Sequence, residues 1–135
     1  MPNTLEVGKK LVELCRAGKN LEAVDSLYAK DVISLEVFGD EKMPARMQGI
    51  EAVRGKNTWW LENHELHSGK VNGPWPHGER FIVHMNYDVT PKTGPTAGKR
   101  MQFEEAGLYT VRDGKIVQEE FFYDMGGDMG GDMGG

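Results

Sequence analysis

The sequence lacks the features that several large classes of protein require. Cys15 is the single cysteine among 135 residues, so no internal disulfide can form. No apolar run approaches the ~20 residues of a membrane-spanning helix, and the first residues lack the basic and apolar regions of a signal peptide. We therefore expect no contact with a membrane and a cytoplasmic location, where a lone thiol stays reduced. Cys15 falls on the apolar side of its predicted helix, so we expect a buried, inert thiol.

Clustered positive charge and metal-ligand motifs are also missing. The chain carries 16 Lys and Arg against 21 Asp and Glu, a formal net charge of −5, and the basic residues are scattered. Nucleic acids are recognised by clustered Lys and Arg, so we expect no nucleic-acid partner. His64 and His67 do not have the spacing of a His-Glu-x-x-His motif, and no Cys pair exists. We therefore expect no metal site and no cofactor.

Helical periodicity occupies the first half of the chain. The pairing of Asn3 with Glu6 predicts the start of a first helix, and Asn20 predicts the start of a second. A third helix is predicted over residues 49–65, after a strand over residues 32–38 and a loop.

From His67 onward the predicted elements are all strands, over residues 68–75, 80–90, 99–111 and 115–124. Asp113-Gly114 joins the last two and is a strong signal for a tight hairpin turn. Helices segregated from a strand meander indicate an α+β domain with the helices on one face of an antiparallel sheet. A bent sheet capped by helices leaves a cavity in which a small molecule can bind.

One domain is expected over residues 1–124. A chain of this size buries roughly two-thirds of its unfolded surface, which is enough for one hydrophobic core. Residues 125–135 repeat Met-Gly-Gly-Asp. Glycine of that density loses too much backbone entropy to fold alone, so we expect a flexible tail.

Two motifs accompany this order of elements. Gln48-Gly49-Ile50-Glu51-Ala52-Val53 opens the third predicted helix. The closing hairpin is Val111-Arg112-Asp113-Gly114-Lys115-Ile116-Val117, and its strand ends in Phe121-Phe122-Tyr123-Asp124. With these motifs, the chain resembles the nuclear transport factor 2-like superfamily, in its SnoaL-like and ketosteroid isomerase-like branch, over about residues 5–124.

The resemblance implies a fold and a range of functions. The fold is a cone-shaped, cystatin-like barrel in which a strongly curved antiparallel sheet and three N-terminal helices enclose a pocket. Members often form homodimers through the convex face of the sheet. The implied function is a pocket for a hydrophobic, polyketide-like or steroid-like molecule. The protein would be a cofactor-independent isomerase, cyclase or hydrolase, or alternatively a non-enzymatic ligand-binding or dimerisation domain.

One predicted strand alternates between apolar and polar residues. Val83, Met85, Tyr87 and Val89 share one face, and His84, Asn86 and Asp88 share the other. The polar face either meets solvent or lines the cavity, and the alternation does not decide between them. If it lines the cavity, Asp88 is the predicted base, His84 its partner and Asn86 a ligand-binding amide. The apolar residues would then face outward, and a second subunit would cover them.

A second candidate lies on the following strand. Adjacent strand residues alternate in direction, so one of Glu104 and Glu105 must face the concave side. In the ketosteroid isomerase branch a buried acid on the corresponding strand donates a hydrogen bond to an oxyanion, and the resemblance implies that Glu105 is its counterpart. Tyr28 and Tyr109 are candidates for that branch's tyrosine donor. The sequence does not show which of Glu119 and Glu120, on the last strand, faces the concave side.

The third predicted helix carries two adjacent tryptophans. Trp59 and Trp60 cannot both face the interior from neighbouring helical positions. Trp60 shares a stripe with Val53 and His64, so we predict that Trp60 and His64 line the pocket. The alternative is that Trp60 fills the core.

Overall fold

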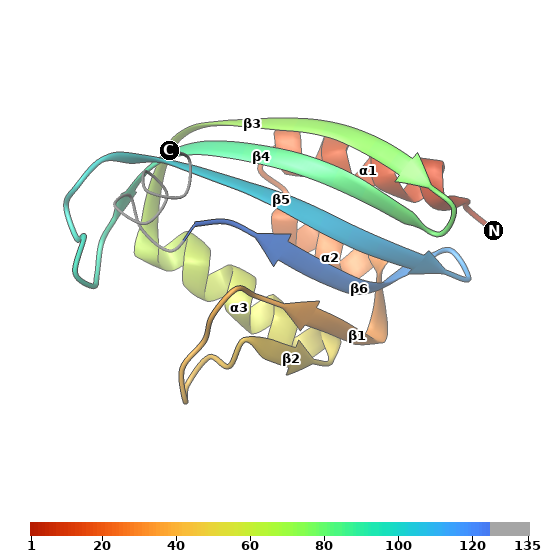
Figure 1. Cartoon of the computed structure of the whole chain (residues 1–135), viewed down its shortest axis with the longest axis horizontal. Coiled ribbons are helices and arrows are strands. Elements are labelled where there is room, and N and C mark those ends of the chain that lie inside the picture. Colours follow the sequence, from red (N-terminus) through yellow and green to blue (C-terminus); the bar gives the residue numbers. More distant parts are fainter. Residues whose placement is uncertain (125–135) are drawn as a thin grey trace.

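A computed structural model describes residues 1–124 of the chain, which form helices packed on one mixed sheet (Figure 1). The helices are α1 (Thr4–Arg16), α2 (Asn20–Leu27) and α3 (Ile50–Asn63). The strands are β1 (Tyr28–Leu35), β2 (Arg46–Gln48), β3 (His64–His77), β4 (Arg80–Pro91), β5 (Met101–Arg112) and β6 (Lys115–Phe122). The predicted tail, residues 125–135, lies outside the described residues.

The strand order in the sheet is β2-β1-β6-β5-β4-β3. Strands β3 to β6 form the predicted antiparallel meander, which confirms the α+β class. The sheet is curled but not closed into a barrel (Figure 1). The expectation of an entirely antiparallel sheet is wrong at one pair, because β1 runs parallel to β6. Strand β2 lies within the segment predicted as a loop and pairs with β1.

Irregular pairing in β3 accompanies the curl of the sheet. The register of β3 against β4 shifts between Leu66 and Ser68 and again between Asn72 and Trp75. Unpaired residues of this kind bend a strand and increase its twist. Pro74, which cannot donate a ladder hydrogen bond, lies in the second irregularity. The bent sheet wraps toward the helices.

Two boundaries follow the local sequence signals. The Asn3 side chain accepts a hydrogen bond from the Glu6 amide, and the Glu6 carboxylate accepts one from the Asn3 amide, so the predicted capping pair of α1 is confirmed. Asp113 and Gly114 both adopt positive φ, 52° and 74°, as the tight turn between β5 and β6 requires.

The helices cover the concave face of the sheet. Figure 1 shows α1 and α2 behind the strands and α3 beside β1 and β2. Helix α1 packs on β3 and β4, while α3 contacts α2, β1 and β2. No helix within residues 1–124 is long and apolar enough to cross a membrane.

The direction of the β4 side chains is settled by this packing. Val83, Met85 and Val89 are buried on the helix-covered face, so His84, Asn86 and Asp88 lie on the opposite, convex face. The expectation that this polar triplet lines the cavity is wrong, because covering the apolar face removes more hydrocarbon from water. The expectation that the apolar set faces outward is wrong for the same reason.

Candidate functional site

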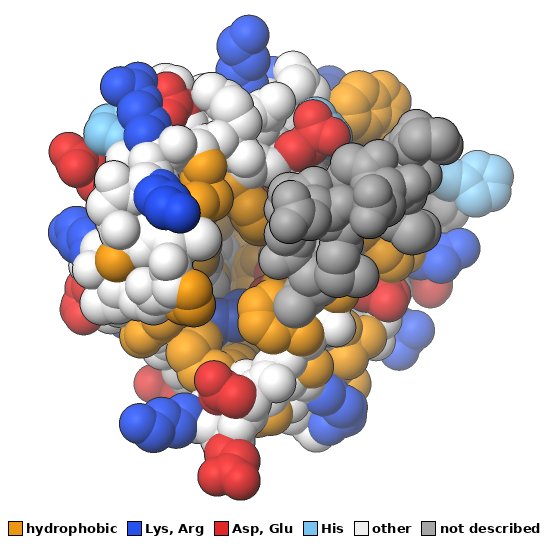
Figure 2. Space-filling view, turned by 60° about the vertical axis from the view of Figure 1, so that its left-hand side comes forward, with side chains coloured by type: hydrophobic (Ala, Val, Ile, Leu, Met, Phe, Trp, Pro, Cys, Tyr) orange, Lys and Arg blue, Asp and Glu red, His pale blue; other side chains and the backbone are white. Residues whose placement is uncertain are grey.

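A cavity of about 400 Å³ lies between the concave face of the sheet and the helices. This volume is in the usual range for sites that enclose small molecules. Figure 2 shows a hollow in the surface that is framed largely by hydrophobic side chains. Aromatic side chains from α3 and four strands line the cavity, among them Tyr28, Trp59, Trp60, Tyr87, Phe103, Tyr109 and Phe121.

A buried carboxylate lies at the wall of the cavity. Glu119 of β6 is 1% exposed. The Tyr28 hydroxyl donates a hydrogen bond to its Oε1, and the Ser34 hydroxyl donates one to its Oε2 at 2.6 Å. The parallel pairing of β1 with β6, which places Ser34 beside Glu119, brings these groups together. Burial and the Glu119 charge raise the pKa of Tyr28 well above its ordinary value, so this hydroxyl keeps its proton.

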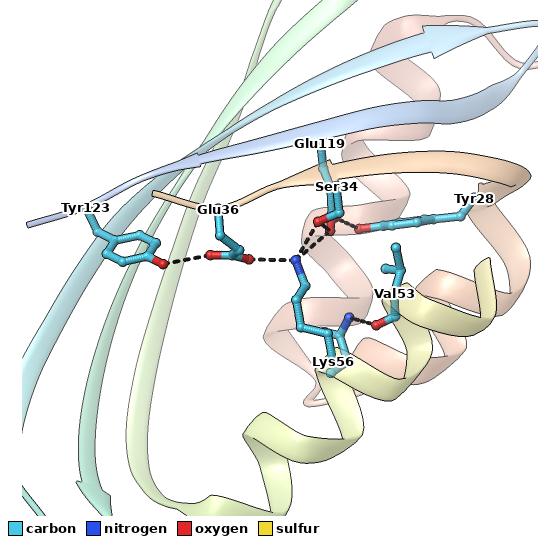
Figure 3. A network of polar contacts seen from close by, with 8 residues as sticks. Tyr28, Ser34, Glu36, Val53, Lys56, Glu119 and Tyr123 are labelled. Carbon is cyan, nitrogen blue, oxygen red and sulfur yellow. Dashed lines mark hydrogen bonds and ion pairs between the residues drawn. The ribbon is translucent and has the colours of Figure 1, made fainter. Parts of the chain in front are cut away.

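Lys56 of α3 connects Glu119 to a second carboxylate. Figure 3 shows Lys56 reaching from the helix toward Glu36 and Glu119. Its Nζ lies 2.6 Å from Glu36 Oε2 and 3.4 Å from Glu119 Oε2, and it donates a hydrogen bond to Ser34. The Tyr123 hydroxyl donates to Glu36 Oε1 at 2.8 Å. One ammonium group thus serves two carboxylates in a hydrogen-bonded network that spans β1, α3 and β6.

Glu105 of β5 is a carboxyl of a different kind. It lines the same cavity and makes no hydrogen bond to another side chain within residues 1–124. Burial raises its pKa to about 8, the charges of Glu36 and Glu119 add to the rise, and Lys56 opposes it. The group therefore holds a proton at neutral pH and exchanges it slightly above neutrality, as a general acid or base needs to do.

The structure brings together five of the eight residues proposed from sequence. Glu105, Tyr28, Trp60, His64 and Tyr109 all line the cavity. The Trp60 and His64 rings stack at 4.4 Å between centroids. Trp59, although 44% exposed, lines the cavity too, so the expectation that only one of the two tryptophans faces inward is wrong.

The other three proposed residues, His84, Asn86 and Asp88, lie on the convex face. Arg100 donates two hydrogen bonds to Asp88, at 2.9 and 2.7 Å, which hold the Asp88 pKa below its ordinary value. His84 Nε2 lies 3.6 Å from Glu104 Oε2. Asp88 and His84 thus have charged partners on the outer surface, and none of the three residues lines the cavity.

Sequence reasoning missed Lys56, Ser34, Glu36 and Tyr123. A signal for Lys56 was present, because it follows Val53 by three residues and precedes Trp60 by four, which places all three on one helix face. Ser34 and Glu36 alternate with apolar residues on one strand, which identifies a polar face but not its direction. The polar contacts of Tyr123 depend on packing between segments distant in sequence.

The functional groups at the site are carboxyl, hydroxyl, ammonium and imidazole. Within residues 1–124, no group of three or more His, Cys, Asp or Glu is arranged to hold a metal ion. Cys15 lines the cavity, and burial raises its pKa to about 12, so the thiol is a weak nucleophile at neutral pH. The arrangement can hold an apolar molecule and exchange a proton with it.

Comparison with known proteins gives one family and one fold. The sequence model of the SnoaL-like domain matches residues 3–123. A candidate SnoaL-like polyketide cyclase from Mesorhizobium loti is 42% identical, with 87% of this chain and 97% of that chain covered and a TM-score of 0.80. A candidate isomerase from Bacillus subtilis is 16% identical, with 91% and 90% covered and a TM-score of 0.73, and shows the fold alone. No curated protein matches the sequence.

Proposed function

The chain belongs to the SnoaL-like domain family, and we propose that it is a cofactor-independent enzyme that binds an apolar small molecule and moves a proton on it through Glu105. The observation that carries the proposal is the position of Glu105, a carboxyl that faces an aromatic cavity and has no side-chain partner within residues 1–124. The reaction class is an isomerisation or cyclisation that begins with proton removal. The relative from Mesorhizobium loti is named both as a polyketide cyclase and as a carbohydrate phosphatase, and the first of these names supports this class.

In the proposed reaction, the ionised form of Glu105 removes a proton from a carbon next to a carbonyl group. The C–H electron pair stays with the substrate and moves onto the carbonyl oxygen, forming an enolate. The Tyr87 and Tyr109 hydroxyls line the same cavity, and burial keeps their pKa values raised, so they retain protons with which to stabilise the oxygen. In an isomerisation, the enolate electrons return through a conjugated double bond to a more distant carbon, which takes the proton from Glu105. In a cyclisation, the enolate carbon forms a bond to the carbon of a second carbonyl group, whose oxygen takes the proton from Glu105. Either step restores the enzyme.

The Lys56 network supports this assignment of roles. Glu36 and Glu119 are held by Lys56 and by hydroxyl donors. Groups fixed in this way serve less well as proton carriers, because transfer would break the contacts that hold them. Among the carboxyl groups that line the cavity, Asp40 also lacks an ion pair within residues 1–124, but it accepts two hydrogen bonds from the backbone amides of Lys42 and Met43. Glu105 accepts no hydrogen bond from the described residues, so it is the group placed to react.

The test is hydrogen exchange of an enolisable aromatic ketone. Wild-type protein in D₂O should accelerate loss of the α-proton signals of 2-tetralone, followed by NMR. Glu105→Gln should lower the enzymatic rate at least ~100-fold, the lower range for loss of a general base. Glu104→Gln is the matched control, because this neighbour lies on the same strand but is exposed on the convex face. A Glu105→Gln variant that exchanges 2-tetralone at the wild-type rate would contradict the proposal.

A second candidate function is ligand binding without chemistry. It is favoured by the extent to which Tyr28, Ser34, Lys56, Glu36 and Glu119 satisfy one another, since such a network stabilises a cavity without reacting. This alternative predicts that 2-tetralone binds, as seen by a rise in thermal midpoint, while its α-protons exchange no faster than in buffer.

We also propose a homodimer through the convex face, on residues other than those first expected. Trp75, Ile82 and Phe122 are 54%, 44% and 49% exposed. Trp75 pairs with Ile82 across β3 and β4, Ile82 pairs with Leu108 of β5, and Phe122 lies one strand further on β6. Exposed apolar side chains grouped on one sheet face are typical of an interface, and a twofold axis is the commonest way to cover such a face.

A further inference from the structure

We propose that the cavity binds a small organic cation, a protonated or quaternary amine, whose charge lies between Glu105 and the surrounding aromatic rings. This inference deepens the proposed function by naming the class of molecule, and it rests on the cavity and on Glu105 as the free carboxyl.

The charges around the cavity are unbalanced toward the acidic side. Within the described part of the chain, the acidic side chains at its lining are Glu36, Asp40, Glu105 and Glu119, and the single Lys or Arg is Lys56. Lys56 contacts Glu36 and Glu119. Glu105 therefore has no positive partner of its own there, and a ligand can supply one.

The walls next to Glu105 are aromatic. Phe103 lies two residues from Glu105 on the same face of β5, and it pairs with Tyr87 of β4. The Phe103 and Tyr123 rings lie 5.3 Å apart, and the Tyr87 and Trp60 rings lie 5.6 Å apart. Ring faces attract ammonium groups, most strongly where water is excluded.

The site already contains one cation held in this way. The Lys56 ammonium lies 4.9 Å from the centre of the Phe121 ring, close to the carboxylates that it serves. A ligand ammonium beside Glu105 and Phe103 would repeat the same combination of carboxylate and ring in the adjacent part of the cavity. A wholly uncharged ligand would leave the ionised form of Glu105 without a positive partner, so we expect the ammonium group to be one part of an otherwise apolar molecule.

Cation binding is coupled to the ionisation of Glu105. The titratable or charged groups that face Glu105 from the surrounding elements are Glu36, Glu119, Lys56, Cys15, Tyr87, Tyr109 and Tyr123. The thiol and the three hydroxyls have raised pKa values and stay neutral near pH 8. Burial keeps Glu105 protonated in the empty cavity, where its pKa is about 8. A cation favours the carboxylate, so binding expels a proton and makes Glu105 a base at neutral pH.

The test compares choline with 3,3-dimethyl-1-butanol, in which carbon replaces the charged nitrogen. Dissociation constants are measured by calorimetry at pH 7 and pH 9. Choline should bind at least about tenfold more tightly than the alcohol, because only choline gains the ring and carboxylate contacts. The affinity for choline should rise about tenfold from pH 7 to pH 9 with ionisation of one group of pKa about 8, whereas that for the alcohol should not change.

Variants separate the charge from the shape of the cavity. Glu105→Gln should abolish the pH dependence and reduce the preference for choline to the several-fold part that the rings supply, while Glu104→Gln should keep the full preference and its pH dependence. Phe103→Leu should weaken choline several-fold more than the alcohol, and Phe122→Leu on the convex face should have no such effect. Circular dichroism confirms that each variant is folded.

Choline that binds no more tightly than the alcohol, including a result in which neither binds, would overturn the inference. A preference for choline that is undiminished in Glu105→Gln would overturn it too. Choline takes no part in proton exchange, so these outcomes are independent of the 2-tetralone experiment. If the wild-type protein exchanges the ketone protons through Glu105 but does not prefer choline, only the cation inference fails and the proposed function stands. If the wild-type protein prefers choline but Glu105→Gln exchanges the ketone at the wild-type rate, only the proposed function fails.

Discussion

Replacing Lys56 by methionine removes the ammonium group that serves Glu36 and Glu119. The Lys56 side chain is 12% exposed, and methionine keeps most of its apolar stem. Removing one partner of a buried ion pair costs about 3–5 kcal/mol, because the other charge is left uncompensated. Glu119 retains the hydrogen bonds from Tyr28 and Ser34, so we expect the lower end, a loss of about 3 kcal/mol in the free energy of unfolding.

Urea unfolding followed by tryptophan fluorescence measures this loss. The midpoint should fall while the dependence of the unfolding free energy on urea stays constant. Lys9→Met, at an exposed position of α1, is the matched control and should change stability by less than about 0.5 kcal/mol. Adding Glu119→Gln to Lys56→Met should recover part of the loss, since it removes the uncompensated charge. A loss below about 1 kcal/mol in Lys56→Met, as for a surface ion pair, would refute the reasoning.

Three further predictions concern the stability and the association of the protein. Tyr28→Phe should cost about 1.5–3 kcal/mol of unfolding free energy, because it removes a buried hydrogen bond to a charged group, and an unchanged urea midpoint would contradict it. The pKa of Glu105 lies at about 8 in the folded protein and 4.5 ordinarily, so wild-type stability should fall relative to Glu105→Gln as the pH rises through that window, by at most about 1.4 kcal/mol per pH unit. Parallel stability curves for the two proteins would exclude that coupling. Ile82→Glu should convert a dimer to a monomer in sedimentation at micromolar concentration, whereas a wild-type protein that is already monomeric would rule out the convex-face interface.

Local signals in the sequence predicted most of the elements and the fold class. The capping pair Asn3 and Glu6 and the turn at Asp113-Gly114 act over a few residues, so the chain displays them directly. The position of β1 beside β6 could not be predicted in this way. The pairing joins Ser34 to Glu119 across the length of the domain, and it depends on packing rather than on local pattern.

The site could be predicted only in part, because the sequence does not show which face of each strand points inward. Strand β4 turns its apolar residues inward, but β1 turns the polar residue Ser34 into the interior, where it contacts Glu119 at the cavity wall. A strand that borders a binding cavity can place either face inward, because the cavity itself needs polar groups. Alternation therefore separated the two faces of each strand without indicating which one was covered. For this reason the family resemblance, and not the alternation, pointed to Glu105, which lines the cavity, while His84 and Asp88 lie on the convex face.

The most direct test of the account is the titration of Glu105 in the folded protein. Glutamate labelled with ¹³C at the side-chain carboxyl gives one resonance per residue, and comparison with Glu105→Gln assigns the resonance of interest. The account predicts a titration midpoint of about 8 for this carboxyl. A midpoint near its ordinary value of 4.5 would show an ionised Glu105 at neutral pH and would contradict the role proposed for it.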